Sequence, residues 1–325
     1  MKLPGLTDII TLPHICMRRL TTPLVYAIIA LGVVQASAMA NTVTQAHDHA
    51  PLEGNHLPLI DDNIVWAIDV LAPAFYMQDD KLVGFGADAV DWLIERISHH
   101  SIKVLTLPRG RAYEVMHHAN VANDHTVCIP GALETPQRAR DFIMSNPVFP
   151  QLPISLIVRA DQADDFAPFM TKNGEVDLPR LLPDNRYYAA IETGRSYGPM
   201  VDDILREHGF GSHIQRTRQM GEFTGMLELG RIDWFLAYPI EAEHERNVAK
   251  LKTEIKSLPI AGMPDMLEAK VACSKTETGQ HVIEHTNAIV AQHPDMPWTQ
   301  SYVDLLSDAD AARYRALIDH RLRSQ

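Results

Sequence analysis

The sequence predicts an α/β protein of two lobes, each a mainly parallel sheet flanked by helices, with a cleft between the lobes. The first observation is that short apolar runs alternate with segments of helical periodicity from residue 63 onward. The second is a proline-rich stretch at residues 147–153, after which the same alternation begins again. The third is size, since 325 residues with 46% hydrophobic and 22% charged residues suffice for two domains of ordinary length.

The first forty residues differ from the rest of the chain. An arginine pair at residues 18–19 precedes an apolar run over residues 24–34, and Ala38-Met39-Ala40 then supplies the small-x-small pattern of a cleavage site. We therefore interpret residues 1–40 as a signal peptide, with Met17 as an alternative true start. A transmembrane anchor is the other interpretation, but the apolar run is short for spanning a bilayer.

Removal of this leader leaves a mature chain that begins at Asn41 and keeps 26 of the 29 basic and 40 of the 41 acidic residues, a net charge of −14. This acidic balance opposes binding to nucleic acid or to anionic lipid. We expect a monomer in the periplasm. Residues 41–60 read as a flexible linker, in which His47-Asp48-His49 is weak evidence for a metal site.

The elements of the first lobe follow the strand-helix-strand order that gives parallel neighbours with right-handed crossovers. In chain order we expect a strand over 64–68, a helix over 87–97, a strand over 102–107, a helix over 113–119 and a strand ending at 128–129. A hinge is expected near residues 150–156, where a strand over 154–159 leaves this lobe.

The second lobe repeats the alternation, with glycines closing two of its helices. The expected elements are strands over 186–191, 213–216, 233–237, 253–257 and 269–274 and helices over 197–208, 222–229 and 240–249. Helices over 277–291 and 301–323 are expected to return to the first lobe. The predicted boundaries are therefore 61–152 plus 280–325 for the first lobe and 153–279 for the second.

Two cysteines, Cys128 and Cys273, remain in the mature chain. Export favours a disulfide. However, each cysteine lies in a strand-like run, and the two runs are assigned to different lobes. The sequence therefore predicts two buried free thiols.

The most informative stretch is Thr135-Pro136-Gln137-Arg138 followed by Phe142-Ile143-Met144-Ser145-Asn146-Pro147. Pro136 fixes a tight turn that directs Arg138 from a loop end, where its planar guanidinium could grip a carboxylate. A solvated surface position is the plainer alternative for this arginine. The stretch resembles the Thr-x-x-Arg and Phe-Ser-x-Pro signature of the bacterial extracellular solute-binding proteins of family 3. The resemblance implies that Thr135 and Arg138 contact the ligand, with Arg138 on its carboxylate.

Other candidates lie directly after predicted strands, where open α/β sheets bind ligands. Asp69, Phe75 and Tyr76 follow the first strand of the first lobe, although core packing is an equal alternative for Phe75. In the second lobe Arg195 and Ser196 occupy a turn before a helix, where Ser196 could bind a carboxylate or cap the helix.

Tyr238 stands where the amino-acid binders of the family carry an acid for the ligand's α-ammonium. A buried ammonium without a counter-charge costs several kcal/mol. We therefore expect a carboxylate that lacks a free α-amino group, unless Asp69, Glu192 or Glu241 supplies the missing acid.

The resemblance implies a binding protein that closes by hinge motion on a small anionic, carboxylate-bearing solute and serves an ABC permease or a membrane sensor. The alternative is a cleft enzyme of the same fold, dehydratase-like, with Glu192 or Asp69 as a general acid. No catalytic motif indicates an enzyme, and no cofactor is expected. The pairs His99-His100 and His117-His118 are adjacent on helices and make poor chelates, so we expect no metal site.

Overall fold

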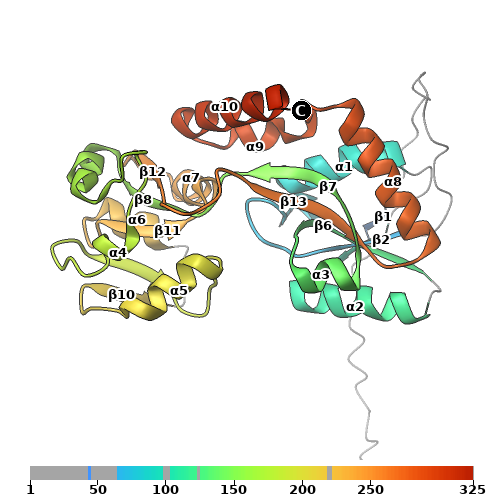
Figure 1. Cartoon of the computed structure of the whole chain (residues 1–325), viewed down its shortest axis with the longest axis horizontal. Coiled ribbons are helices and arrows are strands. Elements are labelled where there is room, and N and C mark those ends of the chain that lie inside the picture. The colour runs from blue at the N-terminus through green and yellow to red at the C-terminus, as the bar shows by residue number, and fades with distance from the viewer. Residues whose placement is uncertain (1–42, 45–63, 98–102, 123–124, 218–221, 325) are drawn as a thin grey trace, which may run out of the picture. The chain divides into compact units, whose positions relative to one another are not determined.

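The computed structural model of the chain describes residues 43–44, 64–97, 103–122, 125–217 and 222–324. These residues contain two mixed sheets flanked by helices and a separate two-stranded hairpin (Figure 1). The predicted signal peptide, its cleavage point and most of the predicted linker, with its His-Asp-His sequence, lie outside the described residues.

The first sheet has six strands in the order β1-β5-β2-β6-β13-β7. The strands are β1 (Val43–Thr44), β2 (Ile64–Ile68), β5 (Lys103–Thr106), β6 (Thr126–Leu133), β7 (Ile143–Gln151) and β13 (Leu267–Cys273). Its helices are α1 (Phe85–Ile97), α2 (Arg109–Ala122), α3 (Pro136–Asp141) and α8 (Glu277–Gln292).

Strand β2 runs parallel to both β5 and β6, as the strand-helix-strand order predicts. Strand β13, in contrast, is antiparallel to its two neighbours β6 and β7. The expectation of a mainly parallel sheet is therefore corrected to a mixed sheet. The reason is that β13 enters from the second half of the chain rather than through a local helical crossover.

The second sheet has five strands in the order β10-β9-β11-β8-β12, and it is also mixed. Its strands are β8 (Ser155–Arg159), β9 (Ala189–Glu192), β10 (Ile214–Thr217), β11 (Trp234–Ala237) and β12 (Ile255–Pro259). Strand β9 is parallel to β10 and β11, whereas β8 is antiparallel to β11 and β12.

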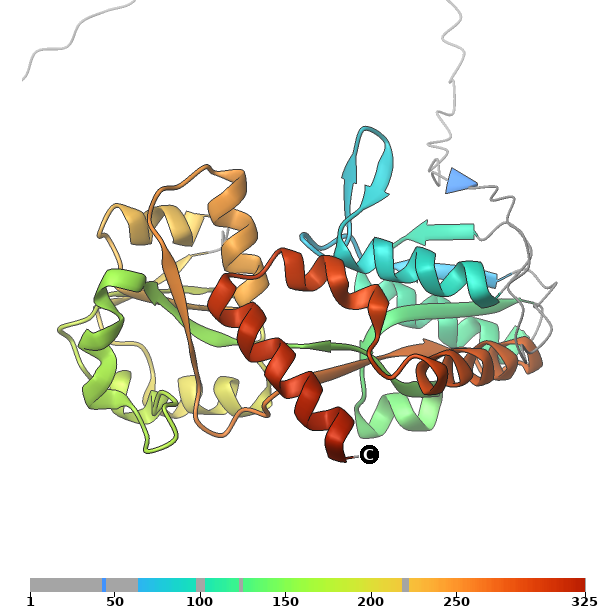
Figure 2. The same cartoon turned by 90° about the horizontal axis from the view of Figure 1, so that it is seen from above.

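Among the described residues, the segments between these strands form five helices. They are η1 (Ala160–Phe169), α4 (Leu178–Leu181), α5 (Pro199–His208), α6 (Phe223–Glu228) and α7 (Pro239–Val248). The hairpin of β3 (Tyr76–Gln78) and β4 (Lys81–Val83) follows β2 and stands clear of the neighbouring elements in Figure 2.

Each sheet has its own hydrophobic core. Trp66 of β2 and the apolar side of α1 lie in the first core, because the buried side chains of α1 recur at the spacing of one helix face, at Val90, Leu93, Ile94 and Ile97. Trp234 of β11 lies in the second core. A sequence pattern of period 3.6 on helices and continuous apolar runs on central strands therefore accounts for both cores.

The predicted C-terminal helix over 301–323 is two helices, α9 (Gln300–Asp304) and α10 (Asp308–Ser324), preceded by the short η3 (Pro297–Thr299). Tyr302 and Tyr314 pack with Leu152, which lies between β7 and β8, and with Ile240 of α7. The C-terminal helices therefore cover the point where the chain passes from the first sheet to the second. No helix among the described residues is long and apolar enough to cross a membrane.

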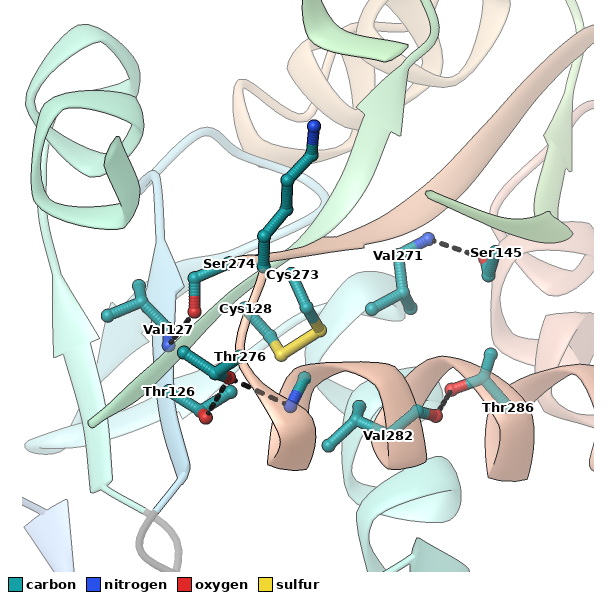
Figure 3. Close-up of a disulfide and its surroundings, with 12 residues drawn as sticks. Thr126, Val127, Cys128, Ser145, Val271, Cys273, Ser274, Thr276, Val282 and Thr286 are labelled. Carbon is teal, nitrogen blue, oxygen red and sulfur yellow. Dashed lines mark hydrogen bonds between the residues drawn. A yellow bond between two sulfur atoms is a disulfide. The ribbon is translucent and has the colours of Figure 1, made fainter. Parts of the chain in front are cut away.

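The prediction of free thiols is wrong. Cys128 of β6 and Cys273 of β13 form a disulfide, with Cα atoms 4.1 Å apart (Figure 3). The two residues are direct partners in the antiparallel register of β6 and β13. The assignment of 269–274 to the second lobe caused the error, because β13 belongs to the first sheet.

Candidate functional site

Three charged side chains lie beyond the carboxyl ends of strands of the first sheet. Asp69 follows β2, Arg109 opens α2 after β5, and Arg138 lies in α3 after β6. The Nε atom of Arg109 donates to Oδ2 of Asp69 at 3.2 Å. Parallel neighbours β2, β5 and β6 bring these three segments to one edge of the sheet, where ligands bind in open α/β folds.

The turn around Arg138 is built by the preceding threonine and proline. The Oγ1 atom of Thr135 accepts from the backbone N–H of Arg138 at 3.2 Å and so caps α3, while Pro136 opens the helix. The guanidinium of Arg138 donates from Nη1 to the carbonyl of Leu133 at 2.7 Å and lies 4.4 Å over the ring centroid of Tyr113. These contacts fix the direction of the guanidinium and leave other donors on it.

Tyr113 of α2 connects the two arginines of this group. Burial raises the pKa of its hydroxyl, and the charges of Arg138 and Arg109 act against this effect. The hydroxyl oxygen is buried and has no hydrogen-bond partner among the described residues. An unpartnered buried donor beside two guanidiniums fits an anionic acceptor supplied from outside the chain.

Arg109 is a residue that the sequence reasoning missed. Its signal was available, because Pro108-Arg109 directly follows the strand predicted over 102–107, and a position after a strand is the rule that selected Asp69. A cation in the first turn of a helix opposes the helix dipole, and α2 has no acid in that turn. Asp69 offsets this cost and holds Arg109 in place.

A second charged group surrounds Arg195 in the second half of the chain. The Nη2 atom of Arg195 donates to Oε2 of Glu241 at 2.6 Å, and its Nη1 lies 3.7 Å from a carboxylate oxygen of Glu192. Burial lowers the pKa of Arg195, but the Glu241 carboxylate outweighs this and the pKa is raised. Burial raises the pKa of Glu241, and Arg195 opposes this effect. Glu241 occupies much of the donor capacity of Arg195 that the sequence reasoning assigned to a ligand.

Tyr238 lies beside this pair, at the start of α7. Its backbone N–H donates to Glu241 at 3.3 Å, and the Arg195 guanidinium carbon lies 5.8 Å from its ring centroid. Burial and the charge of Glu241 raise the pKa of the Tyr238 hydroxyl, while Arg195 and Arg109 act to lower it. Arg109 of the first charged group is thus close enough to act electrostatically on Tyr238.

The structure ties Ser196 to another side chain. Its Oγ donates to Oδ2 of Asp202 at 2.5 Å, and the Tyr197 backbone N–H donates to the other oxygen of the same carboxylate at 2.8 Å. The residue that caps α5 is Gly198, so Ser196 does not have the expected capping role. An anion at Ser196 would face the Asp202 carboxylate.

Phe75 and Tyr76 lie on different sides of the chain. Phe75 is a member of the first core, where an added Cβ at Gly86 would lie 2.6 Å from its Cζ. The core alternative therefore describes its position. Tyr76 is half-buried, and its ring centroid lies 5.6 Å from that of His244 on α7. Of Phe75 and Tyr76, it is therefore Tyr76 that contacts the second half of the chain.

Metal ligands do not gather in the described part of the chain. His117 and His118 are exposed on α2, and no group of three or more His, Cys, Asp or Glu side chains able to hold a metal ion is present among the described residues. The pair His99-His100 lies outside the described residues.

No family model matches the sequence, and no curated protein matches it. Solved structures do match. Substrate-binding domain 2 of GlnP from Lactococcus lactis, in an open conformation, superposes with a TM-score of 0.53 at 14% identity and covers 78% of this chain and 100% of its own. The probable amino-acid ABC transporter extracellular-binding protein ytmK from Bacillus subtilis gives a TM-score of 0.54 at 12% identity, with 78% of this chain and 100% of its own covered.

An ancestral cationic amino-acid solute-binding protein gives a TM-score of 0.51 at 16% identity, with 76% of this chain and 96% of its own covered. At these identities the likeness concerns the fold. The chain has the two-domain type II fold of solute-binding proteins, which is the fold that the stretch from Thr135 to Pro147 indicates.

Proposed function

We propose that the protein captures a small carboxylate-bearing solute between its two domains and delivers it to an ABC permease or reports it to a membrane sensor. The fold supports this proposal, since the structural neighbours named above are a substrate-binding domain, a cationic amino-acid solute-binding protein and a probable amino-acid ABC transporter extracellular-binding protein. The leader supports it as well, because a signal peptide over residues 1–40 would export the protein to the periplasm.

The observation that carries the proposal is the fixed Arg138 guanidinium above Tyr113. A planar fork whose direction is set by a carbonyl bond and by an aromatic ring loses little entropy when it binds a carboxylate. Arg109 and Arg138 together outnumber the single acid Asp69, so this group has a net positive charge in a protein with a formal charge of −12. A carboxylate would balance it.

Closure would occur about the two chain crossings between the sheets, at residues 152–154 and 260–266. The enzyme alternative gains no support from the geometry. Asp69 is ion-paired with Arg109 and Glu192 lies beside Arg195, so neither acid is presented as a free proton donor.

The test begins with mass spectrometry of the acid that co-purifies with the protein. Arg138→Ala should weaken binding of that acid by about 2–5 kcal/mol in calorimetry, because a desolvated carboxylate loses its partner. Arg140→Ala is the matched control, since Arg140 lies on the same short helix with an exposed side chain. Unchanged affinity of the Arg138 variant, or an equal loss in both variants, would contradict the proposal.

A further inference from the structure

The charges of the first charged group, formed by Asp69, Arg109 and Arg138, would be balanced by one carboxylate. Asp69, Arg109 and Arg138 sum to a single positive charge, and the unpartnered Tyr113 hydroxyl lies where both guanidiniums act on it. One solute carboxylate on Arg138 would bring the group to neutrality. The substituent on the solute carbon next to this carboxylate would then lie near Tyr113 and Arg109.

Arg109 keeps its two terminal nitrogens, which carry four N–H donors, for that neighbouring group. Its Nε is bonded to Asp69, and no hydrogen bond from its two terminal nitrogens occurs within the described residues. Its side chain is 39% exposed, so these nitrogens are reachable. They are donors only and they are charged, so they favour a neutral or negative oxygen and disfavour an ammonium.

On the other side the acids are already engaged. Glu241 is 6% exposed and accepts from both Arg195 and the Tyr238 backbone. Glu192 is 25% exposed, and its carboxylate lies 3.7 Å from Arg195. An ammonium at Tyr238 would therefore meet two acids that are already paired with Arg195, and it would lie near the charged guanidinium of Arg109. The tyrosine hydroxyl, in contrast, can donate to an oxygen without a charge cost.

We propose that Arg109, held by Asp69 and acting together with Tyr238, selects carboxylic acids that carry a neutral oxygen acceptor, as a 2-oxo or 2-hydroxy group, next to the carboxylate, in preference to the matching amino acids. This selection rests on the proposed function, since it requires the carboxylate to be bound at Arg138. Asp69 is a positioning residue in this scheme, because it acts through Arg109.

The test uses matched acids that differ only at the second carbon: pyruvate, L-lactate and L-alanine; 4-methyl-2-oxopentanoate and L-leucine; 2-oxoglutarate and L-glutamate. Each is titrated by calorimetry into the wild-type protein, Arg109→Gln, Arg109→Lys and Arg138→Ala. Within the set that binds, the wild type should bind the oxygenated acid at least about tenfold more tightly than the matching amino acid. This ratio corresponds to about 1.4 kcal/mol.

Arg109→Gln should bring this ratio close to one, whereas Arg109→Lys keeps the charge and should retain most of the discrimination against the ammonium. Arg111→Gln is the matched control, since Arg111 lies on the same helix, is exposed and pairs with Glu114. Its ratio should equal that of the wild type. Circular dichroism of each variant separates a lost site from a lost fold.

The outcomes separate the two proposals. If Arg138→Ala abolishes binding while Arg109→Gln leaves the ratio unchanged, the selection by Arg109 is wrong and the anion site stands. If L-amino acids bind the wild type more tightly than their oxygenated counterparts, the selection is also wrong. If none of these acids binds, or if Arg138→Ala binds them as the wild type does, both proposals fail.

Discussion

Glu245 of α7 lies close enough to the Arg195 group for the charges of Arg195 and Glu241 to act on it. Its carboxylate accepts from Oγ1 of Thr224 at 2.9 Å. The pKa of Glu245 is raised to about 7, mainly by burial and also by the charge of Glu241. The hydrogen bond from Thr224 and the charge of Arg195 act to lower this pKa. In the folded protein this group therefore holds its proton at a pH where an unfolded chain has released it.

The stability of the protein should consequently depend on pH through Glu245. Its folded pKa is raised, so the stabilisation is complete below the unfolded value of about 4.3 and is lost as pH rises through about 7. Glu245→Gln removes this dependence and should raise the free energy of unfolding at pH 8, relative to wild type, by about 1–3 kcal/mol. Urea unfolding of both proteins at pH 5, 6, 7 and 8 measures it. Parallel curves for the two proteins would contradict the assignment.

The candidate site shows which residues a single sequence can identify. Asp69 was selected because it follows a predicted strand, and Arg138 because of the Thr-x-x-Arg motif; both residues follow strands of the first sheet. Arg109 obeyed the same rule and was overlooked because no motif marked it. The pairing of Arg195 with Glu241, 46 residues apart, and that of Ser196 with Asp202 depend on side-chain directions that periodicity does not report.

At the scale of elements, the period of the hydrophobic pattern predicted most strands and helices near their observed places. It did not predict partners for strands that are distant in sequence. Strand β13 pairs with β6 and β7 across more than a hundred residues, and the parallel order expected from local crossovers does not apply to it. The hairpin β3–β4 was also missed, because its strands are only three residues long.

The disulfide between β6 and β13 should contribute strongly to stability. It closes a loop with a sequence separation of 145, for which the chain-entropy model gives about 5 kcal/mol. Both cysteines are fully buried, so their replacement also removes packing. The double variant Cys128→Ala with Cys273→Ala should lose about 2–5 kcal/mol of unfolding free energy in urea.

A comparison of the wild type unfolded with and without a thiol reductant isolates the cross-link from the packing loss. Side chains around the bridge provide support that survives reduction. The hydroxyls of Thr126 and Thr276 lie 2.6 Å apart, and Ser274 Oγ accepts from the Val127 backbone at 3.1 Å (Figure 3). The double variant should therefore remain folded. An unfolding free energy equal to that of the wild type would refute a stabilising role.

At the scale of the whole molecule, the two-domain fold could be predicted because one motif and two rounds of strand-helix alternation agree. What holds the crossing between the sheets was not predictable, because it comes from the C-terminal helices. Leu152, between β7 and β8, packs with Tyr302 of α9 and Tyr314 of α10. The last residues of the chain therefore support the segment about which closure is proposed.

Two tyrosines at the crossing between the sheets have opposite hydrogen-bonding roles, since one hydroxyl accepts and the other donates. Their phenylalanine variants therefore form a matched pair. The Tyr302 hydroxyl accepts from the buried backbone N–H of Leu152 at 2.9 Å, whereas the Tyr314 hydroxyl donates to the carbonyl of Pro150 at 3.2 Å. Tyr302→Phe leaves a buried N–H without an acceptor, at a cost of about 1–3 kcal/mol. Tyr314→Phe leaves the Pro150 carbonyl without this donor, and the loss of a donor to a carbonyl costs less free energy than an unpaired buried N–H.

Tyr302→Phe should therefore lower the unfolding free energy more than Tyr314→Phe does, although each variant removes one buried hydroxyl from the same cluster. Hydrogen exchange should show the Leu152 amide losing more protection in Tyr302→Phe than the amides of β2, which lies in the core of the first sheet and away from this cluster. If the two variants lose equal stability, or if protection falls uniformly, the bond from Leu152 to Tyr302 has no special part in holding the crossing.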